Sequence, residues 1–346
     1  MNENDVNRRV TIKDIAEELG LSTATVSNVI HGKTKKISDR TVAKVQEKLQ
    51  ESGYIPNMAA VLLAQNSSRI VCVVVSDHER YEGRMLEDPF VAQMINTISK
   101  ELNSYGYFMM IKEERNIDKI VEYASMWNMA GLILMGYCSV DYEKLRSRMH
   151  IPFVVVDSYE RNVKSYIDIG IDNIDGGYQA GKYLIKKGHE KILYLADNKE
   201  DCDLFRYKGL VKALQEANLP VNEEFYRMVN IEKEKREMDL EEVLLFIEMH
   251  GITAVFAASD MYALEWMRFL LKRGVRVPED ISIIGFDDIP LAAQVYPGLS
   301  TISQDIPARA KMAVEMLHGL VEGNENGGSV LLKARLVERE SVADLR

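Results

Sequence analysis

The sequence has 346 residues, 47% of them hydrophobic and 28% charged, which is the balance of an ordinary globular protein with a large core. It has no run of about 18 apolar residues, and its polar start differs from a secretory signal, so we expect neither a membrane span nor export. The cysteines Cys72, Cys138 and Cys202 are odd in number and widely spaced, which favours buried thiols in a reducing cytoplasm over a disulfide framework.

The net charge of −10 argues against a nucleic-acid partner, but the charge is unevenly distributed. Residues 1–64 hold nine Lys and Arg against eight Asp and Glu, whereas the rest of the chain holds 34 against 45. Seven basic residues flank the stretch 21–32 in the sequence: Arg8, Arg9, Lys33, Lys35, Lys36, Arg40 and Lys44. The N-terminal part is therefore compatible with a local phosphate-binding surface.

Three short helices are predicted in the first 53 residues. Thr11 followed by Asp14 is the pattern of a capping box, and it opens a helix that ends at Gly20. Ser22 caps a second helix over 23–30, and Ser38 caps a third that runs to Gly53. Apolar residues at helical spacing would form a small shared core. They are Ile12, Ile15, Ala16, Leu19, Leu21, Val26, Val29 and Ile30, together with Val42, Val45 and Leu49 on one face of the third helix.

The first two helices are separated by residues 20–22 alone, the spacing of a helix-turn-helix whose second helix enters the major groove of DNA. Thr23, Ala24 and Asn28 on its outward face are candidates to read bases, because Asn pairs with adenine, Thr hydrogen-bonds and Ala contacts a thymine methyl. The candidates to contact phosphate or cap the helix are Ser22, Thr25 and Ser27. An ordinary three-helix bundle with a polar outer face is the alternative.

After this segment Asn57 can cap a short apolar helix over 58–64, and 65–68 is predicted to be a linker. From Arg69 onward, buried apolar strands alternate with helices, which predicts one or two doubly wound parallel sheets. The predicted strands are 70–75, 108–111, 131–135, 152–156, 191–196, 253–257 and 281–286. The predicted helices include 90–105, 176–187, 203–217 and 260–272.

Polar residues stand at the carboxyl ends of several predicted strands, where doubly wound sheets bind ligands. They are Asp157, Ser259, Asp260 and Asp287. The three aspartates have a structural alternative, since Asp157 and Asp287 could cap loops and Asp260 could cap its helix. The strand ends therefore mark a candidate cleft without fixing its use.

The motifs of common enzymes are missing from the sequence. There is no Walker A loop, no GxGxxG opening a strand–helix unit and no GxSxG, and the six histidines lack metal-ligand spacing. A pair of cleft carboxylates could serve a glycosidase, but carboxylates also suit simple sugar binding. We expect no catalysis, no cofactor and no metal.

Several motifs follow one another in a fixed order along almost the whole chain. In the N-terminal part they are VTIKDIA at 10–16, STATVS at 22–27 and GYIPN at 53–57. Downstream they are DPF at 88–90, Asp172-Asn173 with Gly176-Gly177, Gly188-His189, Arg206 three before Gly209, IGFD at 284–287 and RES at 339–341. In this order they resemble the lactose-repressor (LacI/GalR) family of bacterial transcription regulators.

The resemblance implies a small all-α helix-turn-helix headpiece and an α/β periplasmic-binding-protein-like effector domain made of two doubly wound parallel-sheet subdomains. We expect the headpiece at 1–56, a hinge helix and linker at 57–68, and the effector and dimerisation domain at 69–346. The expected subdomains are 69–166 with 300–327, and 167–298 with 329–341, with crossings near 166–168, 297–301 and 327–329.

The resemblance also implies a homodimer on a roughly palindromic operator, with one recognition helix per half-site. The chain's end at 341–346 without a heptad helix favours a dimer over a tetramer. By motif position the hinge helix would insert Leu63 into the minor groove, while Val61 stands where the family usually has a polar or basic residue. The candidate DNA-binding set is Thr11, Ser22, Thr23, Ala24, Thr25, Ser27, Asn28, Asn57 and Leu63.

For the cleft, the resemblance implies hydrogen bonds to the hydroxyls of a sugar or sugar derivative, with a nucleoside or purine as the lesser option. The candidate effector-binding residues are Phe90, as an apolar wall, and Asp157, Arg206, Ser259, Asp260 and Asp287. Arg206 could instead be a structural ion-pair residue, and Asp172 and Asn173 are better explained as a helix cap. We expect a cytoplasmic, ligand-responsive repressor; the contrasting hypothesis is a sugar-binding protein without a regulatory role.

Overall fold

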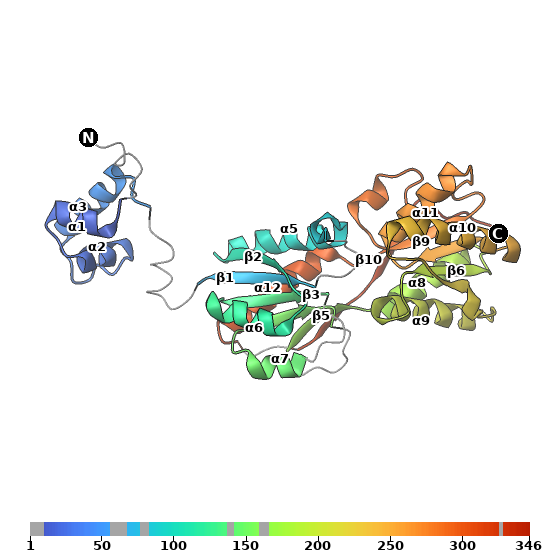
Figure 1. Ribbon diagram of the computed structural model, residues 1–346, viewed down its shortest axis with the longest axis horizontal. Helices are drawn as coiled ribbons and strands as arrows, with labels where there is room; N and C mark the ends of the chain where they lie inside the picture. Colours follow the sequence, from blue (N-terminus) through green and yellow to red (C-terminus); the bar gives the residue numbers. More distant parts are fainter. Residues whose placement is uncertain (1–9, 56–67, 77–82, 137–141, 159–165, 325–327) are drawn as a thin grey trace. The chain divides into compact units, whose positions relative to one another are not determined.

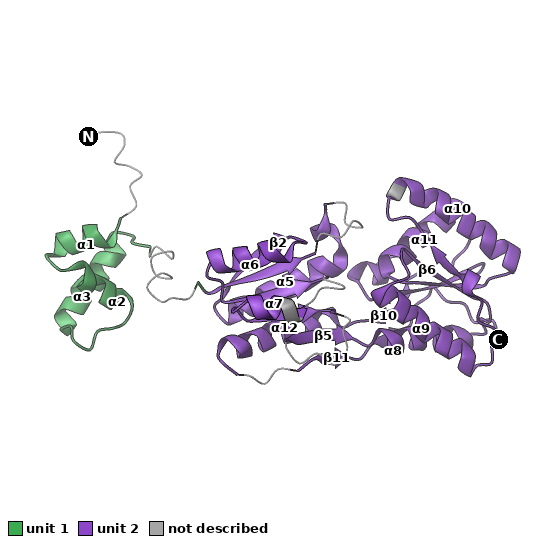
Figure 2. Ribbon diagram, turned by 60° about the horizontal axis from the view of Figure 1, so that its bottom comes forward, with its two compact units in different colours: residues 1–68 green, residues 69–346 purple. Residues whose placement is uncertain are grey.

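The computed structural model of the protein describes residues 10–55, 68–76, 83–136, 142–158, 166–324 and 328–346 (Figure 1). The chain forms two compact units, residues 1–68 and 69–346 (Figure 2). Within the described ranges, no helix is both long and apolar enough to span a bilayer.

The small unit contains three helices: α1 (Ile12–Leu19), α2 (Thr23–Ile30) and α3 (Asp39–Glu51). The predicted caps are present, because the side chains of Thr11, Ser22 and Ser38 each accept a backbone N–H from the first turn of their helix. Gly20 ends α1 with a φ of +65°, a left-handed conformation that favours glycine. The third helix ends at Glu51, two residues before the predicted limit, with Ser52 as its cap.

The core of the small unit is the predicted one. Ile15, Ala16, Val26, Val29 and Val45 are buried together. The other predicted core residues lie at the margin of this cluster, partly buried: Ile12, Leu19, Leu21, Ile30, Val42 and Leu49. The helix-turn-helix therefore has a hydrophobic core of its own.

The first sheet of the larger unit has six parallel strands in the order β11-β5-β4-β3-β1-β2. These are β1 (Ile70–Val75), β2 (Phe108–Glu113), β3 (Gly131–Met135), β4 (Phe153–Val156), β5 (Ile167–Ile171) and β11 (Val330–Leu332). Helices α5 (Pro89–Ser104), preceded by η3 (Met85–Glu87), and α12 (Ile306–Val321) pack on one face. The other face is covered by α6 (Ile117–Met126) and α7 (Tyr142–Arg148) (Figure 1).

The second sheet has the order β12-β10-β9-β8-β6-β7, with β12 antiparallel to β10 and the other neighbours parallel. Its strands are β6 (Ile192–Ala196), β7 (Tyr226–Met228), β8 (Ala254–Ala257), β9 (Ser282–Asp287), β10 (Ser300–Ser303) and β12 (Arg335–Val337). Helices α8 (Asn173–Lys186) and α9 (Asp201–Glu216) cover one face. The other is covered by α10 (Lys233–His250) and α11 (Asp260–Lys272), and the short helices η4 (Glu223–Phe225) and η5 (Pro290–Ala293) lie in the connections.

The chain crosses between the two sheets later than the sequence predicts, so the three expected crossing positions are wrong. Residues 167–168 are part of β5, which pairs with β4 in the first sheet, and the crossing follows β5. Strand β10 belongs to the second sheet, so that crossing follows Ser303. The third crossing lies between β11 and β12. Short strands next to each crossing are defined by distant partners, which local patterns do not reveal.

Candidate functional site

Helix α2 exposes the residues predicted to read bases. Thr23, Ala24 and Asn28 are exposed, while Val26 and Val29 on the opposite side are buried. Neither the first nor the last turn of α2 carries a charged residue. The side chains on the outward surface are therefore short and uncharged, which allows the helix to approach base edges closely.

The neighbouring hydroxyls have structural roles in the small unit. Ser22 Oγ accepts the N–H of Thr25 at 3.1 Å and lies 2.8 Å from Thr25 Oγ1. Thr11 Oγ1 is 2.7 Å from the carboxylate of Asp14, in the capping box of α1. Thr25 and Ser27 are half-buried. Thr11 therefore caps the start of α1, and the exposed Ser22 caps the start of α2 directly after the turn.

Several cationic side chains follow this helix in the sequence and are not paired with the acidic residues of α1. Glu17 and Glu18 pair with Lys13 and Lys48, at 3.8 and 2.5 Å. The exposed lysines and arginine after α2 form no ion pair within the part of the chain that is described; they are Lys33, Lys35, Lys36, Arg40 and Lys44. The predicted contacts Asn57 and Leu63 lie outside the described residues.

A cleft of about 960 Å³ lies in the larger unit and is lined from both sheets. Side chains at the carboxyl ends of parallel strands converge there, as expected for doubly wound sheets. The predicted residues on its wall are Phe90, Asp157, Arg206, Ser259 and Asp287. The cleft continues along α11 and η5 to Tyr296.

On the first-sheet side, Asp157 directly follows β4 and has a φ of +61°. Its Oδ1 lies 2.6 Å from Nη2 of Arg309, a fully buried residue of α12. Arg309 also donates from Nη1 to Gln304 Oε1 at 2.5 Å and from Nη2 to the Ile169 carbonyl at 3.2 Å. Asp157 is thus the cleft-lining member of a buried charge pair rather than a loop cap.

On the second-sheet side, Asp287 ends β9 with a φ of +127°, a strained conformation for a residue with a Cβ. It accepts a hydrogen bond from Gln304 Nε2, and its Oδ1 lies 3.9 Å from Nη2 of Arg206. Because Gln304 also bonds Arg309, one glutamine connects the charged groups of the two walls.

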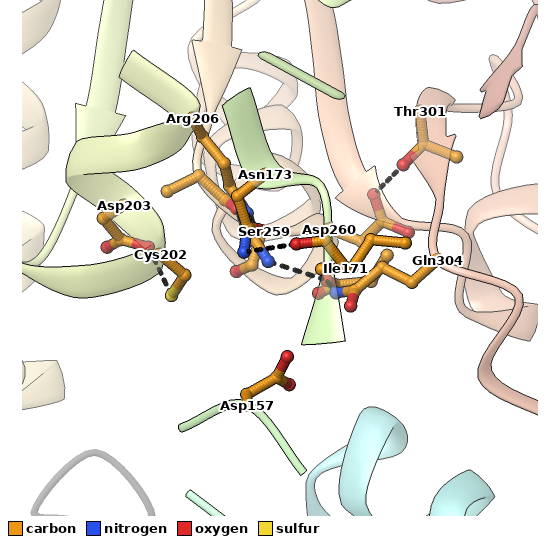
Figure 3. A network of polar contacts seen from close by, with 12 residues as sticks. Asp157, Ile171, Asn173, Cys202, Asp203, Arg206, Ser259, Asp260, Thr301 and Gln304 are labelled. Carbon is orange, nitrogen blue, oxygen red and sulfur yellow. Dashed lines mark hydrogen bonds and ion pairs between the residues drawn. The ribbon is translucent and has the colours of Figure 1, made fainter. Parts of the chain in front are cut away.

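Arg206 is 5% exposed and is oriented by several partners (Figure 3). Its Nε donates to Asn173 Oδ1 at 2.9 Å, and its Nη1 donates to the carbonyl of Ala258. The guanidinium carbon lies 3.7 Å from the centre of the Phe286 ring. Asn173 therefore positions Arg206, a role that the helix-cap interpretation did not include, whereas Asp172 does cap α8 by accepting the Asp175 N–H.

Asp260 does not lie on the cleft wall, so the expected effector contact by this residue is wrong. It is 0% exposed, and its oxygens accept hydrogen bonds from Thr301 Oγ1 at 2.5 Å and from the Ile289 N–H at 2.9 Å. The physical reason is that Asp260 joins three segments beneath Asp287. Ser259 does line the cleft and also caps α11 through the Tyr262 N–H.

Two buried carboxyls lie behind the lining carboxylates. Burial, reinforced by the charge of Asp157, raises the pKa of Asp168 to about 6, despite hydrogen bonds from Ser158. Burial, reinforced by the charge of Asp287, raises the pKa of Asp260 to about 7, despite the bonds from Thr301 and Ile289. Each wall therefore holds a carboxyl that titrates near neutral pH.

Several cleft residues were missed in the sequence. Arg309 could have been found, because it occupies the apolar face of α12 between Ile306 and Ala313, where a cation is unusual. Gln304 gives no local signal, since its role depends on two partners from different strands and helices. Cys202 was expected to be a buried structural thiol but is half-buried on the cleft wall, whereas Cys72 is buried and Cys138 lies outside the described residues.

No group of three or more His, Cys, Asp or Glu side chains in the described ranges is arranged to hold a metal ion. The contacts of the cleft are instead those of hydrogen-bonding recognition, with carboxylates, a guanidinium and a half-buried aromatic ring from Phe90. Carboxylates and guanidinium groups both form two-point bonds to adjacent polar groups of a ligand.

Comparisons with known proteins agree with both units. Residues 11–57 match the bacterial regulatory proteins of the lacI family. Residues 182–342 match the periplasmic binding protein-like domain. The HTH-type transcriptional repressor PurR of Yersinia pestis is 33% identical over 345 residues, covering 96% of this chain and 97% of the relative.

Two solved structures extend the likeness to nearly the whole fold. The lac repressor dimer bound to operator and the anti-inducer ONPF has a TM-score of 0.81 at 26% identity, covering 97% of this chain and 100% of that one. The complex of the transcriptional regulator CelR with cellobiose has a TM-score of 0.70 at 25% identity, covering 96% and 100%. The chain therefore belongs to the lacI family of bacterial regulatory proteins, and it is a DNA-binding transcriptional regulator with a periplasmic-binding-protein-like domain.

Proposed function

We propose that the protein is a repressor that binds a roughly palindromic operator as a homodimer and responds to a small hydroxylated effector in its cleft. The observation that carries this proposal is the exposed, uncharged face of α2 in a helix-turn-helix with free cations close by in the chain. The PurR relative is named a repressor, and the lac repressor structure contains operator DNA.

In this proposal Thr23, Ala24 and Asn28 contact base edges in the major groove, with Asn28 the candidate for a bidentate pair with adenine. Ser22 and the exposed lysines supply phosphate contacts, which fix the position of the helix without reading sequence. Two copies related by a twofold axis would place one α2 in each half-site. Specificity then depends on three short side chains, and much of the affinity on charge.

The proposed hinge contacts remain predictions from the sequence. Leu63 would act as an apolar wedge that unstacks one base step in the minor groove, and Asn57 would cap the segment that carries it. Replacing Leu63 by Ala should weaken operator binding and reduce the DNA bend. If both stay at wild-type values in a gel-shift bending assay, the wedge assignment is wrong.

The effector would lie between the two walls and bond to Asp157, Arg206, Ser259 and Asp287, with Phe90 against its apolar face. Cellobiose in the CelR complex supports a carbohydrate ligand in this fold. Binding can change operator affinity only if the effector prefers one arrangement of the regulator over another. Since Gln304 connects the charged groups of both walls, a ligand that contacts Asp287 also perturbs the partner of Arg309.

The proposed homodimer follows the lac repressor structure, which is a dimer bound to operator. Sedimentation analysis of the full chain tests it. A dimer is the expected result, and a monomer at the concentrations that bind operator would contradict the proposal.

We place the protein in the cytoplasm and assign it no catalytic role, as its relatives are regulators. A mobility-shift selection with randomised palindromic DNA tests the regulatory function directly. Sequence-selective binding that weakens steeply with salt is the expected result. Absence of selective binding at moderate salt would contradict the proposal and favour a sugar-binding protein without a regulatory role.

A further inference from the structure

Each wall of the cleft contains two neighbouring carboxyl groups and one buried guanidinium. On the first-sheet wall these are Asp157 and Asp168 with Arg309. On the second-sheet wall Asp287 lies beside Arg206, and the buried Asp260 lies next to Asp287. In both cases one carboxylate lines the cleft and the other lies behind it. Figure 3 shows Arg206 and Asp260 of the second wall.

The lining carboxylate of the first wall borders the cleft and is paired on its inner side. Asp157 is 8% exposed, and its Oδ1 lies 2.6 Å from Nη2 of the buried Arg309. Figure 3 shows its carboxylate pointing toward the side chains around Asp260 and Gln304. A carboxylate on the wall of a cleft accepts hydrogen bonds, so it favours a ligand that donates them.

With all four carboxyls ionised, the two carboxylates of each pair outnumber their one guanidinium. Unbalanced charge in a poorly solvated site is costly, and it is removed by protons or by a bound cation. Other cations also line the cleft. Arg84 lies 3.6 Å from Glu87 and Arg236 lies 2.5 Å from Glu265, so both are paired, and Arg268 and Lys272 belong to α11.

Two more carboxyl groups on the lining add to the negative charge. Asp88 caps α5 by accepting the Val91 N–H at 3.0 Å, and Asp203 lies in the first turn of α9 beside Cys202. A phosphate or carboxylate on the ligand would face these groups as well as Asp157 and Asp287. Repulsion of this kind discriminates between ligands by charge.

We propose that the cleft selects a hydroxylated ligand that bears an ammonium group, such as an amino-deoxy sugar, and rejects its phosphorylated counterpart. This rests on the proposed function, in which the cleft is the effector site. The ammonium group would lie between Asp157 and Asp287 and replace the protons that otherwise balance the walls. Hydroxyls of the same ligand would bond to Arg206 and Ser259.

Ligand binding should release protons, and the direction follows from the groups on each wall. Asp260 faces Thr301, the Ile289 N–H, Asp287 and Asp288, and its pKa is raised to about 7 by burial and by the Asp287 charge. Asp168 faces Ser158, Asp157 and Arg309, and its pKa is raised to about 6. A bound ammonium favours the ionised form of both, so affinity should rise with pH until these carboxyls are ionised.

The test uses the full chain and ligands matched at one position: D-glucose, 6-amino-6-deoxy-D-glucose and D-glucose 6-phosphate, with the corresponding series on ribose. The added amine is an alkylamine, which stays protonated up to pH about 10, so its own titration does not interfere. Titration calorimetry should show the amino member of one series binding at least about tenfold more tightly than the neutral member, and the phosphorylated member not binding. Its affinity should rise by up to about tenfold per pH unit below pH 7.

Three results would overturn the inference: no binding by either amino compound, binding of a phosphorylated member in the cleft, or pH-independent binding of the amine. Asp287→Asn and Asp157→Asn should each reduce the preference for the amine over the neutral sugar. Asp280→Asn, at an exposed carboxylate paired with Arg276, should leave that preference unchanged.

The proposed function fails separately from this inference. If the ligand-free chain selects an operator but no amine binds, the ligand class is wrong and the regulator stands. If amines bind but no DNA is selected, the regulatory proposal fails and the ligand class stands.

Discussion

The headpiece and the cleft use polar residues in opposite ways. In the headpiece, Thr23 and Asn28 are exposed and the supporting hydrogen bonds, such as Ser22 to Thr25, join residues three apart. In the cleft, Arg206 is buried and bonds to residues 33 and 52 positions away. A surface that reads DNA can be built from one capped helix, whereas a site that senses a small molecule needs partners from several strands.

The largest expected effect tests the buried network around Arg206 in the cleft. Replacing Arg206 by Met should destabilise the larger unit by about 3–5 kcal/mol, because Asp287 and Asn173 would lose a buried charged partner. Urea unfolding of the full chain measures this effect. Arg276→Met, at an exposed arginine, is the control. A loss as small as that of the control would mean that the network does not hold the cleft together.

The second prediction concerns the pH dependence of stability in the cleft. The folded-state pKa of Asp260 is raised to about 7 from 3.8, so its stabilising contribution is complete below pH 3.8 and is lost as pH rises through 7. Ionisation of Asp260 should therefore lower the free energy of unfolding by on the order of a few kcal/mol as the pH rises from 3.8 to above 7.

Asp260→Asn places a neutral side chain at that position. The hydroxyl of Thr301, which donates to Asp260, can rotate so that its oxygen accepts a hydrogen bond from the amide of the new Asn. The variant should lose less stability than the wild type between pH 5 and pH 8, measured by urea unfolding at each pH. Equal slopes for the two proteins would show that Asp260 is already ionised at pH 5.

A mutation on the outward face of the headpiece should change the preference for operator sequence and leave the fold unchanged. Asn28→Ala should weaken binding by about 1–3 kcal/mol at one base pair of the selected operator and relax the preference there, because Asn28 is exposed and bonds to no core residue. Competition mobility shifts with single-base operator variants measure this. Gln46→Ala, at an exposed position on α3, serves as the control. A uniform loss across all operator variants would point to a phosphate contact instead.

The smallest expected effect tests whether each headpiece helix is stabilised by its own cap. Ser22→Ala should cost about 1 kcal/mol of local stability, since it removes the cap of α2. Amide hydrogen exchange should become faster in α2 and stay unchanged in β1 of the full chain. Ser38→Ala should instead make amide exchange faster in α3, the helix that Ser38 caps. Faster exchange throughout the larger unit would contradict the independence of the two regions.

The same contrast explains what could be predicted from the sequence. The caps Thr11, Ser22 and Ser38 are local signals, so all three headpiece helices were predicted within two residues of their observed ends. Central strands such as β1 and β3 were also predicted with their observed limits, because both faces are buried and the run is continuously apolar.

What the sequence did not reveal depends on distant partners. Strands β5 and β10 are short and become strands through pairing with β4 and β9, so the crossings were misplaced. Asp260 and Ser259 adjoin in sequence, yet only the structure shows that one is buried and the other lines the cleft. The ion pair between Asp157 and Arg309 joins residues 152 apart, and no motif connects them.

Helices α8 and α9 approach so closely that two glycines are required between them. A Cβ on Gly177 would lie 1.9 Å from the carbonyl oxygen of Arg206, and one on Gly209 would lie 2.2 Å from the carbonyl oxygen of Ile174. Any side chain at either position would push α9 away and withdraw Arg206 from the cleft. For protein engineering this divides the site into two parts: the lining at Phe90 is open to redesign for new ligands, while the glycine contact must be left intact.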